Sequence, residues 1–271
     1  MEELFREPSH QIKRIPFRPL PYISDFVVEK FPLLLQDVRE GKMDAELFAE
    51  ICTTVIQRLW DKNSHLHLSH DNFAKILLHP TIRGVALLDL KIMEMGIVHS
   101  GVMPSKLLTQ LIDEFSYAAE LPPMLTYEEI VLVNPSRDWR TFTFGSIGHT
   151  ERDFYLAHAR SEEHMEQAIN ALKESIRLLL FHDSKRHYQI KGLIDRTAVQ
   201  LSELVGYIGK MRTTMSGEHF TIFRQYLNSH PIRGVVSPVF LQPGKMIPET
   251  HYTYSKENKM VGLKGPSATF T

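Results

Sequence analysis

The sequence contains a single cysteine, Cys52, among its 271 residues. One thiol cannot form an internal disulfide or a thiolate metal cluster, so both kinds of stabilisation are excluded. The chain also lacks an apolar run approaching the roughly 20 residues that cross a bilayer. Its first residues, Met1–Arg6, lack the basic-then-apolar pattern of a secretory signal. We therefore expect a cytoplasmic protein without a membrane segment, with Cys52 in the core.

An excess of charge of either sign is absent as well. The chain has 31 lysines and arginines against 32 aspartates and glutamates, a net charge of −1. This balance leaves no electrostatic footprint for nucleic acid or an anionic membrane, and we expect neither partner. A hydrophobic content of 43% and a charged content of 23% are ordinary for a globular protein. The length suffices for one large domain, or a large one with a smaller neighbour.

Hydrophobic periodicity predicts helices along most of the chain, and hence an all-α fold. Asp44 is a suitable N-cap for an amphipathic helix that extends to Trp60. Further helices are expected at residues 73–78, 82–95, 105–119, 149–159, 161–181 and 189–211, and around Arg224. Ser105 would cap the helix at 105–119, and Pro80 would end the helix at 73–78.

Proline, glycine and serine locate the irregular segments. Residues 1–22 form a proline-rich arm, and residues 230–271 lack periodicity and are expected to form a long loop. Pro122 and Pro123 interrupt the helical pattern, and residues 124–133 are rich in β-forming residues and are expected to be extended. With a turn at 134–138, we place a junction here, between a small helical domain (1–135) and a larger helical domain (136–271).

Fourteen histidines are many for this length, but they are scattered and no HExxH spacing occurs. His65, His67 and His70 lie close together and could contribute to a transition-metal site. Such a site needs further ligands, so a solvated loop is the favoured interpretation. The sequence identifies no metal ligands.

The segment Ser216–Leu227 places one arginine on an apolar and aromatic helical face. Phe220, Phe223, Arg224 and Leu227 recur at steps of three and four residues. A buried guanidinium needs an anion, and its planar fork suits a carboxylate bound by two hydrogen bonds. The simpler alternative is an arginine whose stem packs while its head reaches water or an internal acidic group.

His149 and Asp153 are four residues apart and therefore share one helical face, just after Gly145 and Gly148. A histidine there could transfer a proton, and glycines would let the backbone approach a flat ligand. The alternative is a surface helix with a weak His149–Asp153 pair. Tyr127 is most simply a packing residue at a domain junction. Residues 264–269 form a small-residue loop that could line a pocket or could be a frayed terminus.

Together these segments resemble the superfamily of haem-dependent aromatic oxygenases. Residues 120–134 resemble the segment that links the small and large domains of indoleamine 2,3-dioxygenase, and residues 218–229 resemble its stretch of aromatic residues, arginine, tyrosine, leucine and serine. That second stretch is also similar to the Phe-Arg helix of tryptophan 2,3-dioxygenase. Residues 265–268 resemble the family's Gly-Gly-Ser-Ala loop. His149 with Asp153 resembles the distal histidine and acid of tryptophan 2,3-dioxygenase, where indoleamine 2,3-dioxygenase has serine.

The resemblance implies an indoleamine 2,3-dioxygenase-like fold, a haem cofactor, and an aromatic amino acid as substrate with O2 or peroxide. Arg224 would bind the substrate carboxylate, and Phe220 and Tyr127 would form walls of the aromatic pocket. His149 would be the catalytic residue on the distal side of the haem. Ser267 would border both substrate and haem, with Ala268 beside the haem. Superfamily members catalyse ring opening, hydroxylation or rearrangement, and the residues do not choose among them.

The sequence departs from this superfamily at one point. The proximal histidine of the family lies well after the Gly-Ser-Ala loop, whereas this sequence ends at Thr271. His182 and His187 precede Arg224 and do not match that ligand. We therefore expect one of three situations. The chain lacks the C-terminal helices that carry the ligand, or a second chain or a homo-oligomer supplies those helices. In the third case, the protein does not bind haem in the family manner. The leading hypothesis is a haem-dependent oxygenase; the alternative is a non-catalytic helical module that binds an aromatic amino acid.

Overall fold

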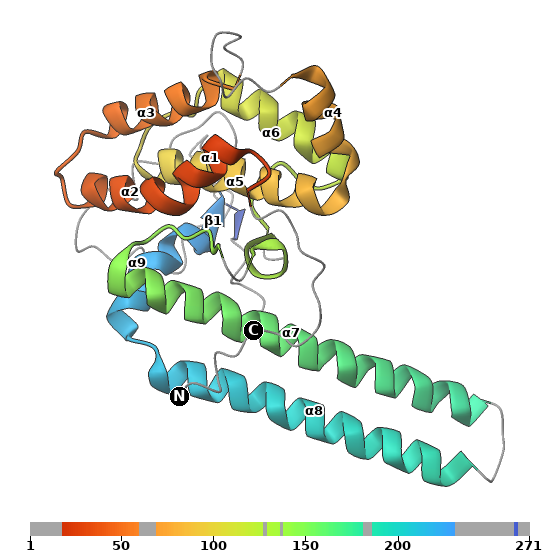
Figure 1. Cartoon of the computed structure of the whole chain (residues 1–271). Coiled ribbons are helices and arrows are strands. Elements are labelled where there is room, and N and C mark those ends of the chain that lie inside the picture. Colours follow the sequence, from red (N-terminus) through yellow and green to blue (C-terminus); the bar gives the residue numbers. More distant parts are fainter. Residues whose placement is uncertain are drawn as a thin grey trace, which may run out of the picture. The chain divides into compact units, whose positions relative to one another are not determined.

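The computed structural model describes residues 18–59, 69–126, 129–135, 138–180, 186–230 and 263–264. Over these residues the chain divides into two compact units. Unit 1 comprises residues 153–216, and unit 2 comprises the described residues up to Arg152 and from Gly217 onward. Figure 1 shows the elements of both units.

The regular elements of the described residues are helices apart from one short pair of strands, which confirms the predicted all-α fold. Unit 2 contains the following elements: α1 (Pro21–Asp25), η2 (Phe26–Lys30), α2 (Phe31–Arg39), α3 (Ala45–Gln57), α4 (His70–Leu78), α5 (Pro80–His99), α6 (Lys106–Ala119), η3 (Glu129–Val133) and α9 (Gly217–Asn228). The two-residue strands β1 (Ser229–His230) and β2 (Leu263–Lys264) pair in an antiparallel manner. None of the described helices has the length and apolar character that a bilayer crossing requires.

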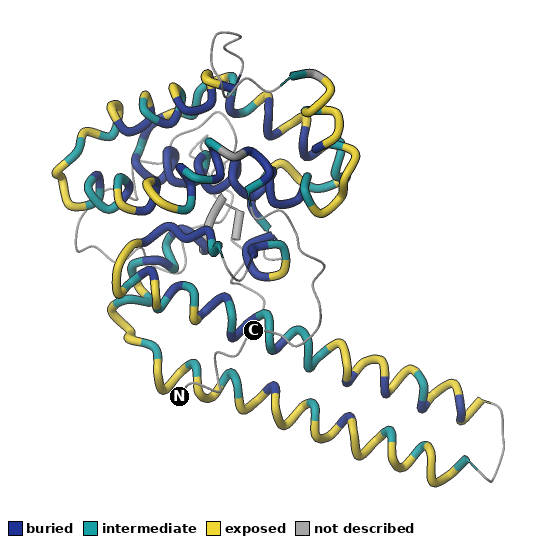
Figure 2. The backbone as a smooth tube through the Cα atoms, in the orientation of Figure 1, coloured by how far each residue is buried: buried dark blue, intermediate teal, exposed yellow. Residues whose placement is uncertain are grey.

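Helix α5 is the central element of unit 2. Its apolar residues are spread around the whole circumference, which is typical of a helix that is buried on all sides, and nearly every side chain from Gly84 to His99 is buried. Helices α1, α4 and α6 and the π-helical turn η3 pack against it. In Figure 2, buried residues run along α5, while exposed residues mark the outer faces of α2, α3 and α4. The core of unit 2 is therefore built around one helix.

The capping residues predicted from the sequence begin their helices as expected. The Asp44 carboxylate accepts hydrogen bonds from the backbone N–H groups of Glu46 and Leu47 at 2.9 and 3.2 Å. The Ser105 hydroxyl accepts one from the N–H of Leu108 at 3.3 Å. Cys52, on α3, is fully buried, and burial raises the pKa of its thiol. The prediction that Cys52 is a core residue is confirmed.

Among the described residues of unit 2, the buried ion pairs Asp89–Arg140 and Lys91–Glu129 both join α5 to residues 129–140. Arg140 donates from Nε to Asp89 Oδ1 at 2.6 Å and from Nη2 to Oδ2 at 3.3 Å, and the Ser24 hydroxyl donates to Oδ2 at 2.6 Å. Burial raises the pKa of the Asp89 carboxyl, while Arg140 and Ser24 act in the opposite direction. The Lys91 ammonium donates to Glu129 at 2.6 Å.

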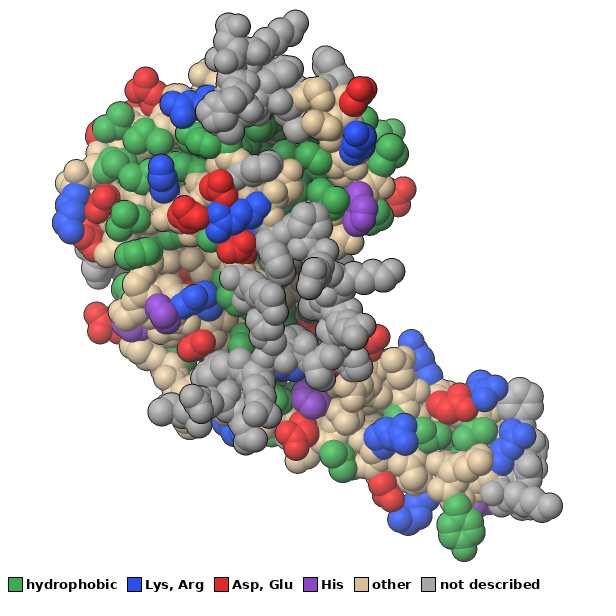
Figure 3. Space-filling view, viewed as in Figure 1, with side chains coloured by type: hydrophobic (Ala, Val, Ile, Leu, Met, Phe, Trp, Pro, Cys, Tyr) green, Lys and Arg blue, Asp and Glu red, His purple; other side chains and the backbone are tan. Residues whose placement is uncertain are grey.

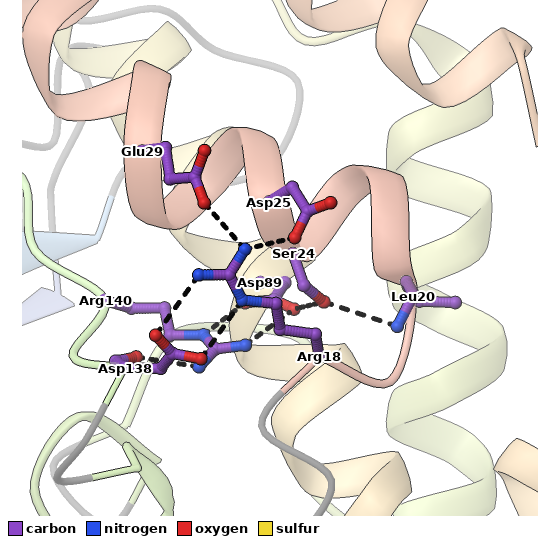
Figure 4. A network of polar contacts seen from close by, with 8 residues as sticks. All are labelled: Arg18, Leu20, Ser24, Asp25, Glu29, Asp89, Asp138 and Arg140. Carbon is purple, nitrogen blue, oxygen red and sulfur yellow. Dashed lines mark hydrogen bonds and ion pairs between the residues drawn. The ribbon is translucent and has the colours of Figure 1, made fainter.

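The Asp89–Arg140 pair continues into a wider polar network (Figure 4). Arg140 donates to the Asp138 carbonyl at 2.8 Å, and Arg18 donates to both carboxylate oxygens of Asp138 at 3.1 and 3.2 Å. Arg18, the first described residue, also binds Asp25 on α1 and Glu29 on η2. The network therefore joins α1, η2, α5 and the segment around Asp138.

This network bears on two predictions for residues 124–138. Residues 129–133 are not extended but form the π-helical turn η3, because Glu129 is buried and bonded to Lys91 and Thr126. Tertiary contacts thus override the β-propensity of this segment. The compact units also do not divide at residue 135, where the sequence predicted a junction. Arg140 and the residues up to Arg152 belong to unit 2.

Unit 1 is a helical hairpin of α7 (Gly145–Leu180, from Asp153 onward) and α8 (His187–Thr214). The sequence predicted two helices at 149–159 and 161–181, with Ser161 at the break. The structure instead has one continuous helix. The Ser161 hydroxyl donates to the carbonyl of Ala157 at 2.9 Å, a bond within the helix rather than a cap. Helix α8 begins and ends within three residues of the predicted 189–211.

Candidate functional site

Helix α9 carries Arg224, the arginine of the apolar and aromatic face. It is tied to unit 2 through Phe223, Tyr226 and Leu227, which are all buried. Phe220 and Arg224 are half-buried on the flank of this face. The Arg224 guanidinium lies 5.3 Å from the centroid of the Phe220 ring, within the range of a cation–π contact. The four-residue spacing predicted this pairing, and the structure brings the two side chains together.

Tyr226 fixes the orientation of α9. Its ring stacks on Phe142 with centroids 4.8 Å apart and planes 8° apart, and it meets His99 edge-on at 4.9 Å. Burial raises the pKa of Tyr226 to about 12, against the opposing influence of Arg39, so its hydroxyl is protonated at neutral pH. Since a helix held at Tyr226 cannot rotate freely, the flank with Phe220 and Arg224 keeps one position within unit 2.

Glu151, near the start of α7, holds the segment that contains Phe142, the residue on which Tyr226 stacks. Its buried carboxylate accepts hydrogen bonds from the backbone N–H groups of Phe142 and Thr143, both at 2.9 Å, and from the Thr143 hydroxyl. These three hydrogen bonds position the aromatic ring of Phe142, on which Tyr226 stacks. The sequence did not single out Glu151, because a glutamate near the start of a helix is common and carries no distinctive signal.

Gly148 allows a close backbone approach, as predicted, but the approaching group belongs to the chain itself. A Cβ atom at Gly148 would lie 2.5 Å from the Thr143 carbonyl oxygen. At Gly145, which has a positive φ of 62°, an added Cβ would meet nothing within 4 Å. The two glycines therefore permit the turn into α7, and they give no reason to place a flat ligand here.

The proposed distal residue, His149, is exposed. The contact that we observe between the start of α7 and α9 joins Thr150 and His219, with the hydroxyl 2.8 Å from the imidazole Nδ1. In the sequence, His219 is one residue of the segment 216–227 that carries Arg224. Its role as the link from α9 to α7 depends on tertiary structure and has no sequence signature.

Several predicted residues lie outside the described part of the chain. They are Tyr127, Ser267 and Ala268 of the expected pocket, His65 and His67 of the histidine group, and His182. Their predicted roles stay predictions. Among the residues that the structure does describe, no group of three or more histidine, cysteine, aspartate or glutamate side chains is placed to hold a metal ion.

In the described part of α9, Arg224 and Phe220 place a half-buried cation against an aromatic ring on an anchored helix. Such a pair can hold a carboxylate by two hydrogen bonds while the ring contacts apolar or aromatic parts of the same ligand. No model of a known protein family matches this chain, and no curated protein matches it. The resemblance to haem-dependent aromatic oxygenases therefore stays a prediction.

Proposed function

We propose that this protein binds an aromatic amino acid, with the carboxylate on Arg224 and the ring beside Phe220. One observation carries the proposal: the Arg224 guanidinium lies over Phe220 on a helix anchored by buried Phe223 and Tyr226. A guanidinium held in this way loses little conformational freedom when it binds an anion. The short segments that resemble aromatic amino-acid oxygenases support the same class of ligand.

The enzymatic form of this proposal is a haem-dependent oxygenase that acts on tryptophan, tyrosine or a derivative, in the cytoplasm, with O2 or peroxide. Haem would supply the activation of oxygen. The described residues do not fit that cofactor. His149, the only described residue of those assigned to its surroundings, is exposed, and the resemblance assigns no described residue as its axial ligand. We therefore derive no chemical step through haem.

The exposed position of His149 favours the second candidate, a helical module that binds an aromatic amino acid without redox chemistry. Both candidates share Arg224 and the carboxylate. They differ in whether the protein takes up haem and whether the amino acid then perturbs it.

Calorimetry tests the shared part. Tryptophan and tyrosine would be titrated into the wild-type protein, Arg224→Ala and Arg224→Lys, with Arg196→Ala, an exposed arginine on α8, as the matched control. We expect Arg224→Ala to lose about 1.5–3 kcal/mol of binding free energy, the value of a charged hydrogen-bonded pair. Lysine should recover only part, because it lacks the fork geometry.

Tryptamine, which lacks the carboxylate, is the matched ligand control. Wild type should bind it as weakly as Arg224→Ala binds tryptophan, and Arg224→Ala should not distinguish the two ligands. Equal affinities of wild type and Arg224→Ala for tryptophan and tyrosine would refute the assignment of Arg224.

Absorption spectroscopy separates the two candidates. Protein reconstituted with haemin would be examined for a Soret band and for its shift on addition of tryptophan or tyrosine. A band that shifts with substrate in wild type, and less in His149→Ala, supports the oxygenase. Amino-acid binding without haem uptake supports the binding module.

A further inference from the structure

We propose that one side of the α7–α8 hairpin is a docking surface for the same hairpin of a second copy, so that the two form a four-helix bundle. This inference concerns unit 1 alone and is independent of the proposed function.

The helices of the hairpin first pack on each other through small and polar residues. From Ser161 onward, the buried residues of α7 follow one stripe: Ser161, Ala168, Ala171, Ser175 and Leu178. On α8 only Thr197 and Leu204 are buried. His164 on α7 lies 2.6 Å from Gln200 and stacks on the Tyr207 ring at 5.3 Å, so it ties α7 to α8. Most of the large apolar side chains of the two helices lie outside the interface between α7 and α8.

Each helix carries a second stripe of residues, each of which follows a position of the stripe that packs between the two helices by one residue. On α7 it comprises Met165, Ile169, Leu172, Ile176 and Leu179, and on α8 it comprises Ile194, Ala198, Leu201, Val205 and Ile208. Both stripes advance by steps of four, three, four and three residues, the spacing of a helix–helix packing surface. Neither stripe contains a charged residue.

The two second stripes lie on the same side of the hairpin. A step of one residue turns about 100° around a helix in the same sense along each chain. Because α7 and α8 run in opposite directions, this turn brings both stripes to one side of their shared interface. The remaining positions carry charged residues, among them Glu163, Lys173, Arg177, Arg196 and Glu203. We call this apolar side, defined by the ten residues of the two second stripes, the bundle face.

The bundle face is exposed in the structure. Exposed fractions are 57% for Ile176, 55% for Leu179, 51% for Ile194 and 65% for Val205, with Ile169, Leu172 and Leu201 between 41% and 43%. Apolar side chains are visible among charged ones on the surface of the hairpin in Figure 3. Monomeric proteins seldom expose a continuous apolar strip of this kind.

A second copy fits this face for two reasons. These seven exposed side chains, together with the flanking residues, can form the apolar core of a standard interface, which buries roughly 800 Å² per partner. An uncharged face with the same spacing on both helices is also complementary to itself, as a two-fold interface requires. Two hairpins then bury both second stripes, and the charged sides of all four helices face solvent.

Sedimentation equilibrium of the full chain tests the proposal, with Ile176→Glu and Val205→Glu on the bundle face. Val199→Glu is the control, because Val199 is 57% exposed, as Ile176 is, but lies on the other side of α8. We expect dimers for wild type and Val199→Glu. Each bundle-face variant should raise the dissociation constant by at least about tenfold, as a charge is forced into an apolar contact.

Circular dichroism would establish that the variants keep their helices. Should a variant unfold, hydrogen exchange of the wild type at two concentrations gives a second measurement. Peptides covering 165–179 and 194–208 should exchange more slowly at the higher concentration, and peptides of α5 should not. The proposal is overturned if the wild type is monomeric at every concentration. It is also overturned if the Ile176→Glu and Val199→Glu dimers have equal dissociation constants, or if cross-links from the bundle face reach only the same chain.

Discussion

Charged side chains in the core of unit 2 have a structural role at the residue scale. Asp89 and Arg140 are both fully buried and joined by two hydrogen bonds, and each has further partners in Ser24 and Asp138. A sequence gives no reason to choose Arg140 over Arg224 as the arginine that meets a carboxylate inside the fold. The choice depends on which helix brings an aspartate to it, and here that helix is α5.

We predict that Arg140→Met destabilises the protein by about 3–5 kcal/mol, because it leaves the Asp89 carboxylate buried without its cation. Chemical denaturation monitored by circular dichroism measures the change. Lys191→Ala is the control. It breaks an ion pair with Asp195 whose side chains are 75% and 63% exposed, so the expected change is below about 1 kcal/mol.

The double variant Asp89→Leu with Arg140→Met refines the interpretation. If the cost of the single variant comes from the stranded carboxylate, removal of both charges should restore much of the stability. Equal losses in the single and double variants would mean that Arg140 acts through packing instead.

At the scale of the element, α5 illustrates why a helix can be predicted while its packing cannot. The periodicity predicted residues 82–95, and the helix extends from Pro80 to His99. The close contact at Gly96 could not be foreseen. A Cβ atom there would lie 2.3 Å from the tip of the Phe31 ring, which is itself fully buried between Phe26 and Phe48.

We expect Gly96→Ala to destabilise the protein by about 1–3 kcal/mol, since the ring has no room to move. The control is Gly206→Ala on α8, where an added Cβ meets nothing within 4 Å. This substitution should stabilise by up to about 1 kcal/mol, as alanine favours helix over glycine. Melting temperatures that shift in the same direction for both variants would contradict the close contact at Gly96.

At the scale of the whole molecule, the two units differ in how much they bury. The core of unit 2 surrounds α5, whereas α8 of unit 1 buries only Thr197 and Leu204 among its described residues. Local opening requires less free energy where few apolar side chains are packed. The difference predicts that unit 1 opens first.

Hydrogen exchange should reveal this order at a protein concentration too low for self-association. Amides in residues 190–208 should exchange faster than those in residues 85–98 by a factor on the order of a hundred. Equal protection of the two segments would mean that the chain opens as one cooperative unit. At high concentration, protection of the hairpin should increase if the bundle face associates.

The sequence by itself determined most of the helices from Ala45 onward, because hydrophobic period and capping residues such as Asp44 and Ser105 act within a few residues. It also determined that Phe220 and Arg224 share one side of α9, because four residues span about one helical turn. Only the tertiary structure decided that residues 129–133 turn instead of extending, that Ser161 lies inside a continuous α7, and that Arg140 meets Asp89. It likewise decided that Thr150 contacts His219 and that His149 is exposed. These outcomes depend on residues distant in sequence, whose encounters are set by packing around α5 and carry no local pattern.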